Sequence, residues 1–166
     1  MVTLFMTVGT GRPDPRTGRA SIAHGLAYSV ACHRPGEVVF FGSDQSAATV
    51  RGIAEEYQEM TGEVLPPFNS VVLPDVDDLA ACIEVMDAAV KGVAGRKAID
   101  YTSGTKSMTA AAVIVAALHQ VPLSLVEARR GVDGIGISGT EHLREQRLSP
   151  AYTRVLREQV GADALE

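Results

Sequence analysis

The sequence predicts an α/β fold built on a mainly parallel sheet, and two features of the chain lead to this prediction. Short runs rich in β-branched and aromatic residues alternate with longer segments in which apolar residues recur at every third or fourth position. Parallel neighbours need crossover connections, which are right-handed, so this alternation favours one sheet with helices on both of its faces. Gly and Pro residues separate the two patterns and mark the loops.

The first half of the chain contains two strand–helix units and a third strand. The strands are compact β-branched or aromatic runs, and each helix carries apolar residues with helical spacing. Clusters of Gly and Pro end most of these elements, and a serine can cap the second helix. In chain order, the elements are a strand Val2–Val8, a helix from Thr17 or Ser21 to near Pro35, a strand Val38–Phe41, a helix from Ser46 to Gly62 and a strand Ser70–Leu73.

The second half continues the alternation and ends differently. Its third helix has an acidic outer face, and its fourth helix, Met108–His119, is apolar nearly all round, so it must be buried between the sheet and something else, such as a second subunit. The alternation in Val132–Ile137 predicts an antiparallel sixth strand that closes a hairpin. We therefore expect a Rossmann-like, six-stranded sheet with a C-terminal β-hairpin. The remaining elements are a helix Pro74–Val90, strands Lys97–Tyr101 and Pro122–Val126, and a short helix Pro150–Val160.

Length and composition are those of one folded domain. The chain has 166 residues, 46% hydrophobic and 21% charged, which excludes a disordered chain, a collagen and a small disulfide scaffold. The longest apolar run, Ala110–Leu118, has nine residues where a membrane span needs roughly 20, and the N-terminus lacks the basic start of a signal peptide. We expect a cytoplasmic protein with residues 1–145 as the Rossmann-like domain and residues 146–166 as an amphipathic helix and tail.

The net charge of −5 is unevenly distributed. Residues 52–95 hold one Lys or Arg against nine Asp or Glu, whereas residues 1–51 hold five against three and residues 96–130 hold five against two. The two positive segments also contain the turns rich in Gly, Ser and Thr. A compact anionic ligand fits this pattern better than a long nucleic acid.

The loop after the first strand is a candidate phosphate site. Its glycines let backbone N–H groups approach an anion, its threonine offers a hydroxyl donor and its arginine a cation. The loop matches the dinucleotide-binding fingerprint only in part, because the third glycine is missing, so NAD binding is weakly supported. The candidate residues are Gly9, Thr10, Gly11 and Arg12.

A second loop, Asp100–Met108 (DYTSGTKSM), is more specific. It places four hydroxyls and a lysine at the end of a strand and the start of a helix, where an anion is favoured. It is not a Walker A loop, since a threonine separates its glycine from its lysine. Both loops lie beyond the carboxyl ends of strands, where such sheets bind ligands. The candidate residues of this loop are Thr102, Ser103, Gly104, Thr105, Lys106, Ser107 and Met108.

Other residues carry weaker signals. Asp44, after the second strand, could accept a hydrogen bond from a ribose hydroxyl. Arg19 and His24 form an R-x4-H pattern that we interpret as coincidence, and His119 is expected to interact with the C-terminal carbonyls of its own helix. None of the four histidines follows a strand end, so no general base is evident. Both cysteines, Cys32 and Cys82, fall in apolar helical patterns and are expected to be reduced core thiols, and we expect no metal and no cofactor.

With both loops in view, the chain resembles the CRISPR-associated Rossmann-fold sensor domain, abbreviated CARF. The resemblance covers roughly residues 1–145 and depends on the strand-one ending TVGTG and above all on DYTSGTKSM, which is similar to the family pattern D-x-T-G-G-T-K-x-M. Ser103 stands in place of the commoner glycine, which adds a hydroxyl and removes backbone freedom. The resemblance implies a homodimer, joined here through the helix 108–118, that binds a cyclic oligoadenylate across its two-fold axis in a type III CRISPR antiviral system.

The resemblance also leaves questions open. Members of this family usually fuse the sensor to an effector, often a nuclease, for which this sequence has no room, so it is either cut from a longer protein or works alone. Some members slowly cut their own messenger, which makes a metal-independent ring nuclease feasible, with Thr10 and Lys106 as its catalytic candidates; Ser103 and Thr105 could donate further hydrogen bonds. The alternative is a Rossmann domain that binds one linear nucleotide or dinucleotide per chain.

Overall fold

The computed structural model describes residues 1–151, 154–155 and 158, and its centre is a six-stranded sheet in the order β3-β2-β1-β4-β5-β6. The first five strands are parallel, and β6 is antiparallel to β5. This confirms the predicted fold class. The strands are β1 (Val2–Thr7), β2 (Glu37–Gly42), β3 (Phe68–Val72), β4 (Arg96–Asp100), β5 (Leu123–Glu127) and β6 (His142–Gln146).

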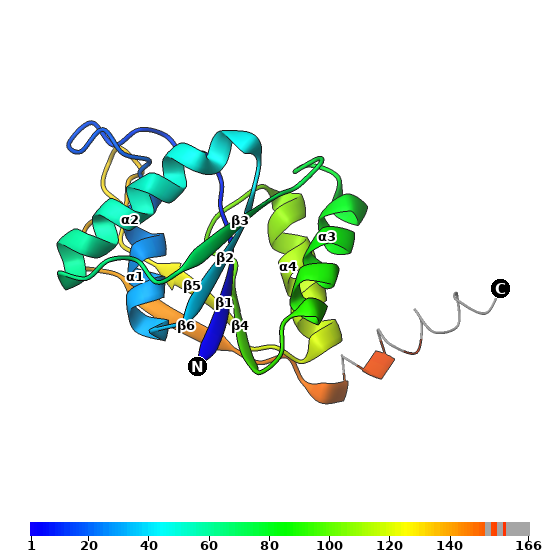
Figure 1. Ribbon diagram of the computed structural model, residues 1–166. Coiled ribbons are helices and arrows are strands. Elements are labelled where there is room, and N and C mark those ends of the chain that lie inside the picture. The colour runs from blue at the N-terminus through cyan, green and yellow to red at the C-terminus, as the bar shows by residue number, and fades with distance from the viewer. Residues whose placement is uncertain (152–153, 156–157, 159–166) are drawn as a thin grey trace.

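Four α-helices cover the sheet in two pairs (Figure 1). Helices α1 and α2 pack together on one face, and α3 and α4 pack together on the other. A single 3-10 turn, η1 (Asp44–Ser46), precedes α2. The helices are α1 (Ala23–His33), α2 (Ala47–Thr61), α3 (Leu79–Gly92) and α4 (Lys106–His119).

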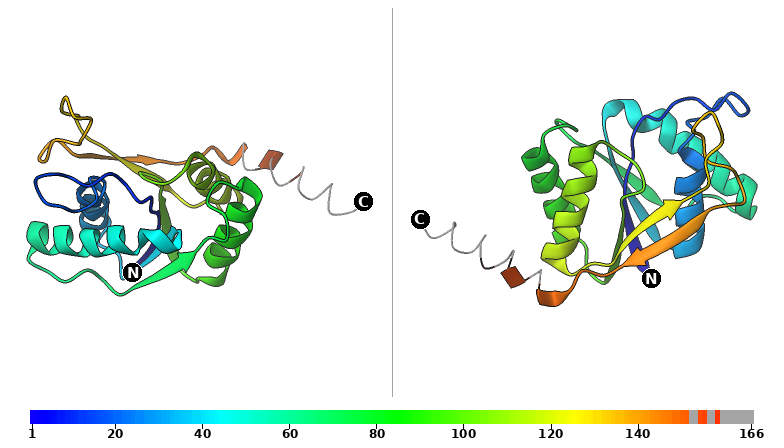
Figure 2. Two further views of the ribbon diagram at one scale, coloured as in Figure 1. Left: turned by 90° about the horizontal axis from the view of Figure 1, so that it is seen from above. Right: turned by 180° about the vertical axis from the view of Figure 1, so that it is seen from behind.

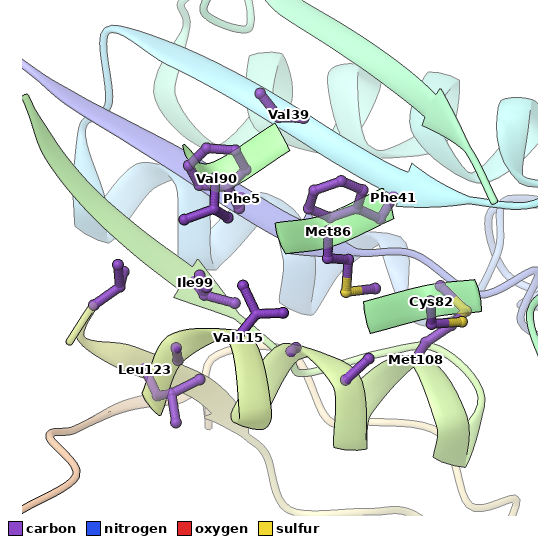
Figure 3. Close-up of a cluster of buried hydrophobic side chains, with 14 of the residues drawn as sticks. Phe5, Val39, Phe41, Cys82, Met86, Val90, Ile99, Met108, Val115 and Leu123 are labelled. Atoms are coloured by element: carbon purple, nitrogen blue, oxygen red, sulfur yellow. The ribbon is translucent and has the colours of Figure 1, made fainter. Parts of the chain in front are cut away.

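Alternation along β1 and β2 supplies a separate apolar core on each face. Leu4 and Met6 of β1 pack toward α1 and α2, while Phe5 packs toward α3 and α4. Phe5 stacks on Phe41 with ring centroids 6.0 Å apart, and Figure 3 shows Phe5 beside Val90 and Phe41 beside Met86, both residues of α3. The strands are thus buried on both sides, as parallel strands under crossover helices must be.

The last strand lies further along the chain than predicted. Val132–Ile137 forms no strand; it belongs to the connection from β5 to β6, where Arg130 and Gly136 make one isolated bridge. The strand that closes the hairpin is His142–Gln146, paired with all of β5, and Figure 2 shows the two as adjacent yellow and orange arrows. Glycines at 131, 134, 136 and 139 favour turns over pairing in the predicted segment.

The two cysteines differ in their exposure. Cys82 is buried in the core, but Cys32 is exposed on α1, so only one of the two cysteines is a core thiol. Part of the predicted helix Pro150–Val160 lies outside the described residues. Within the described residues, no helix is long and apolar enough to cross a membrane.

Candidate functional site

The loops after β1 and β4 meet at the carboxyl edge of the sheet. The backbone N–H of Gly9 donates a hydrogen bond to Ser103 Oγ at 3.2 Å. A Cβ at residue 9 would lie 3.3 Å from the backbone nitrogen of Gly104, so the two loops are in close backbone contact. The adjacency of β1 and β4 in the sheet therefore brings the two predicted anion loops together.

A hydrogen bond from β1 and a glycine conformation fix the backbone of the loop after β4. Thr7, fully buried at the end of β1, donates its hydroxyl to the carbonyl oxygen of Ser103. Gly104 has a φ of +120°, a conformation that side chains rarely adopt, so glycine is needed at that position. Ser103 has no such φ, and a serine fits there without backbone strain.

A cavity of about 250 Å³ opens where these loops approach the loop after β2. It brings together residues predicted from three separate stretches of sequence. Thr10 and Asp44 are exposed there, and their side chains have no hydrogen-bond partner in the described part of the chain. The predicted site residues that line the cavity are Gly9, Thr10, Asp44, Thr105 and Met108.

Two hydroxyls at the start of α4 form hydrogen bonds within the protein. Thr105 caps the helix by accepting the Met108 N–H at 3.2 Å, and it donates its own proton to the carbonyl oxygen of Val76. Ser107 donates to the carbonyl oxygen of Asp77 at 2.7 Å. The O–H of Thr105 thus already has an acceptor in the loop before α3, and donation to a ligand, which stays a prediction, would have to replace that bond.

Lys106 differs from its neighbours in this loop. It is exposed in the first turn of α4, and within the described residues its ammonium group forms no ion pair or hydrogen bond. The helix macrodipole slightly disfavours a cation at this end, so the lysine gains nothing locally from its place. A free cation beside the backbone N–H groups of a helix start is suited to bind an anion.

The remaining three predicted residues, Gly11, Arg12 and Thr102, lie at another part of the edge. Arg12 Nη2 lies 3.4 Å from the carbonyl oxygen of Asp133, in the connection from β5 to β6. Thr102 Oγ1 accepts the Val126 N–H at 2.8 Å and lines a separate cavity of about 110 Å³ over α1. Gly11, at φ +64°, gives the first loop its turn toward that side.

Two solved structures share this architecture. Can2 from Sulfobacillus thermosulfidooxidans, in complex with cyclic tetra-adenylate, aligns with a TM-score of 0.56 and 14% identity over 90% of this chain. Csm6 from Enterococcus italicus, bound to cyclic hexa-2'-fluoro-hexa-dAMP, aligns with a TM-score of 0.59 and 13% identity over 98% of this chain. The chain therefore shares the fold of the aligned parts of these two structures.

The shared fold accounts for only part of those two structures. This chain spans 37% of the length of Can2 and 46% of the length of Csm6. No family model and no curated protein matches the sequence. The TM-scores show a common fold, but at 13–14% identity the ligand has to be argued from the site.

A buried carboxyl at the end of β4, beneath the loop that follows, was missed by sequence reasoning. Asp100 is fully buried, and its Oδ1 accepts the Thr102 N–H at 2.9 Å. Ser29 and Ser124 donate to its Oδ2 at 2.5 and 3.2 Å. Burial raises the pKa of Asp100, and the hydrogen bonds from Ser29 and Thr102 partly oppose that rise. Asp100 opens the sequence motif, but nothing in the sequence marks its serine partners.

The histidines also differ from expectation. His24, on the first turn of α1, lines the cavity beside Thr102, so one histidine does lie at the carboxyl edge. Its Nδ1 lies 2.8 Å from Glu56, which also binds Arg19 at 2.9 Å, so the R-x4-H residues meet through one carboxylate. His119 contacts Asp87 of α3 at 2.6 Å instead of its own helix carbonyls. The described residues include no cluster of three or more His, Cys, Asp or Glu suited to a metal.

Proposed function

We propose that this domain binds a cyclic oligoadenylate across a homodimer, as the sensor of a type III CRISPR antiviral system. The observation that carries the proposal is the junction of Gly9 with Ser103, in the loop whose Lys106 forms no ion pair or hydrogen bond within the described residues. The loop after β4 thus offers the Ser103 hydroxyl, the first backbone N–H groups of α4 and a lysine, which are groups that suit a phosphodiester. The two structures of like fold were solved with cyclic adenine oligonucleotides, which supports a ligand of this class.

The symmetry of the ligand supports the dimer. Two copies of the loop pair, related by a two-fold axis, present matched anion sites to a ring of repeating phosphates. Much of α4 is covered by α3 and the sheet, which narrows the surface available for a partner. Ala110 is exposed and Ile114 is half-buried, one helical turn apart, and we assign the dimer contact to this strip.

The binding experiment is calorimetry with four- and six-membered oligoadenylate rings and with linear tetra-adenylate. We expect one ring per two chains and much weaker binding of the linear molecule. One linear molecule per chain supports the alternative, a Rossmann domain for a linear nucleotide. Absence of heat and of a thermal shift with any ring, from folded dimeric protein, contradicts the proposal.

Assembly has its own test. Sedimentation at micromolar concentration is expected to show a dimer, and Ile114→Glu is expected to yield a folded monomer with weakened ring binding, because a charge cannot be buried unpaired in the contact. Val132→Glu, on an exposed loop residue, is the control. A monomeric wild-type chain that binds a ring with full affinity excludes this interface.

Cleavage of the ring is the second part of the proposal. A ribose 2'-hydroxyl attacks the adjacent phosphorus in line; the P–O2' bond forms, the P–O5' bond breaks, and the proton lost from O2' is balanced by one gained at O5'. The products carry a 2',3'-cyclic phosphate and a 5'-hydroxyl. Lys106 stabilises charge on the phosphoryl oxygens, and the exposed Thr10 hydroxyl donates a hydrogen bond.

The cleavage test is incubation of the ring with protein in EDTA, followed by chromatography. We expect slow formation of linear products that continues without metal and is lost in Thr10→Ala and in Lys106→Ala. Lys97→Ala, at the opposite edge of the sheet, serves as the control. A ring that stays intact for many hours leaves a binding module without nuclease activity.

The division of the chain follows from this function. We propose residues 1–145 as the sensor and residues 146–166 as a link to an effector domain. The two longer structures of like fold are consistent with a sensor that is one part of a larger protein.

A further inference from the structure

A chain of polar side chains runs from the ligand loop through the interior. Asp100 is fully buried at the end of β4 and holds the Thr102 N–H at one oxygen. Ser29 of α1 and Ser124 of β5 donate to its other oxygen. His33 Nε2 lies 2.9 Å from Ser124 Oγ, one helical turn beyond Ser29 on the same face of α1. These five residues form one continuous hydrogen-bonded path.

The path reaches solvent at the amino edge of the sheet. His33 is half-buried and lines a cavity of about 420 Å³ there, far from the ligand loops in the chain topology. A serine hydroxyl is both donor and acceptor, so Ser124 can pass a proton between imidazole and carboxyl. Besides His33, the charged and titratable residues of this cavity are Arg96, Lys97, His119, Glu145 and Arg147.

The surroundings of Asp100 disfavour a permanent charge. No Lys or Arg of the described residues forms an ion pair with it. Its hydrogen bonds come from hydroxyls and one backbone N–H, which compensate a buried carboxylate only in part. Two other titratable groups interact electrostatically with the path: Tyr101, next in the loop, with Asp100, and Glu145 of β6 with His33.

We propose that Asp100 takes up a proton when a polyanionic ligand occupies the loop, with Ser124 and His33 as its connection to solvent. The inference rests on the proposed function. Asp100 accepts a hydrogen bond from the backbone of the loop to which ligand phosphates bring negative charge. Because like charges repel strongly in a weakly screened interior, the phosphates disfavour the ionised form of Asp100. The proton moves from solvent to a carboxylate oxygen, and no bond of the ligand changes. By linkage, the affinity rises as pH falls through the range where Asp100 titrates.

The experiment is calorimetry of ring binding at one pH in several buffers that differ in ionisation enthalpy, repeated from pH 5 to pH 8. We expect the heat to vary with the buffer by up to one proton per chain, which is two per ring. The ring affinity should then gain up to about a hundredfold per pH unit in that range. Asp100→Asn, which keeps an oxygen for the Thr102 N–H, is expected to bind the ring with no buffer dependence. His24→Gln is the control for the other histidine near the loop and is expected to leave the uptake unchanged.

Each result decides between the proposals. Ring binding with the same heat in all buffers at every pH overturns this inference and leaves the proposed function intact, and so does proton uptake that persists in Asp100→Asn. Failure of the folded dimer to bind any ring overturns both. If Asp100→Asn does not fold, Ser124→Ala is tested instead. This variant removes one hydrogen bond to the Asp100 carboxylate, so the pH range of proton uptake must move to higher pH. An unchanged pH range overturns the inference.

Discussion

The backbone N–H of Gly9 donates to the hydroxyl of Ser103 at 3.2 Å, and this bond joins the loop after β1 to the loop after β4. Ser103 stands where the pattern that the sequence resembles has a glycine, which could not accept the bond. The position with positive φ is Gly104, so the serine adds an acceptor without backbone strain. The departure from the pattern thus strengthens the junction on which the proposed site depends.

Replacement of this hydroxyl is expected to loosen the junction. Ser103→Ala leaves the Gly9 N–H without its acceptor and should lower the free energy of unfolding by about 1 kcal/mol, as for a typical lost hydrogen bond. Ring affinity should fall severalfold, because the Gly9 backbone is no longer held beside the second loop. Denaturant unfolding and calorimetry measure the two effects, with the exposed Ser70→Ala on β3 as control. Lower stability with unchanged affinity would show that the bond serves the fold alone.

Lys106 is expected to act on the ligand and not on the fold. Lys106→Ala removes a cation that has no partner within the described residues, so the unfolding free energy should change little. A charge-assisted hydrogen bond to phosphate contributes about 1–3 kcal/mol, so ring affinity should fall tenfold or more. The matched control is Lys97→Ala at the amino edge of the sheet. Equal losses for both lysines would point to general charge attraction and not to a contact.

Most of the fold could be predicted from the sequence because β1, β2, β4 and β5 each contain neighbouring buried residues. The exception is β6, where HLREQ has a single half-buried apolar residue, Leu143, on a sheet edge. The better alternation in Val132–Ile137 belongs to a loop, because its glycines carry no side chains to pack. The position of the edge strand β6 is therefore determined by its pairing with β5 more than by its own hydrophobic pattern.

The site could be predicted as far as strand ends determine it. Gly9, Thr10, Asp44 and Thr105 follow or precede predicted elements, and parallel strands bring such loops to one edge. The sequence could not show which group each hydroxyl binds. Thr105 donates to the carbonyl oxygen of Val76, 29 residues away, in a loop that only tertiary packing brings near. The partners of Asp100 lie 71 and 24 residues away, so its role also depends on the folded arrangement.

Thr105 is expected to serve stability more than binding. Thr105→Val keeps the shape of the side chain and removes both the helix cap and the bond to the Val76 carbonyl oxygen. Loss of such a cap typically costs about 1 kcal/mol, and the unpaired carbonyl adds to that cost, so thermal unfolding should occur at a clearly lower temperature. Thr109→Val is the control, since that hydroxyl bonds only to carbonyls of its own helix turn. A variant with normal stability but lost ring affinity would restore Thr105 as a ligand donor.

His33 is expected to make stability depend on pH below neutrality. Burial lowers the pKa of His33 from its ordinary value of 6.5, although Asp100 and Glu145 partly oppose this. Between the lowered folded value and the unfolded value near 6.5, the unfolded chain binds more protons, so the free energy of unfolding falls as pH falls through that range. His33→Gln removes this contribution, and its stability relative to the wild type should therefore improve from pH 7 to pH 5. Urea unfolding at several pH values measures the difference, with the exposed His142→Gln as control. A constant difference between His33→Gln and the wild type across this range would show that His33 titrates alike in the folded and unfolded chains.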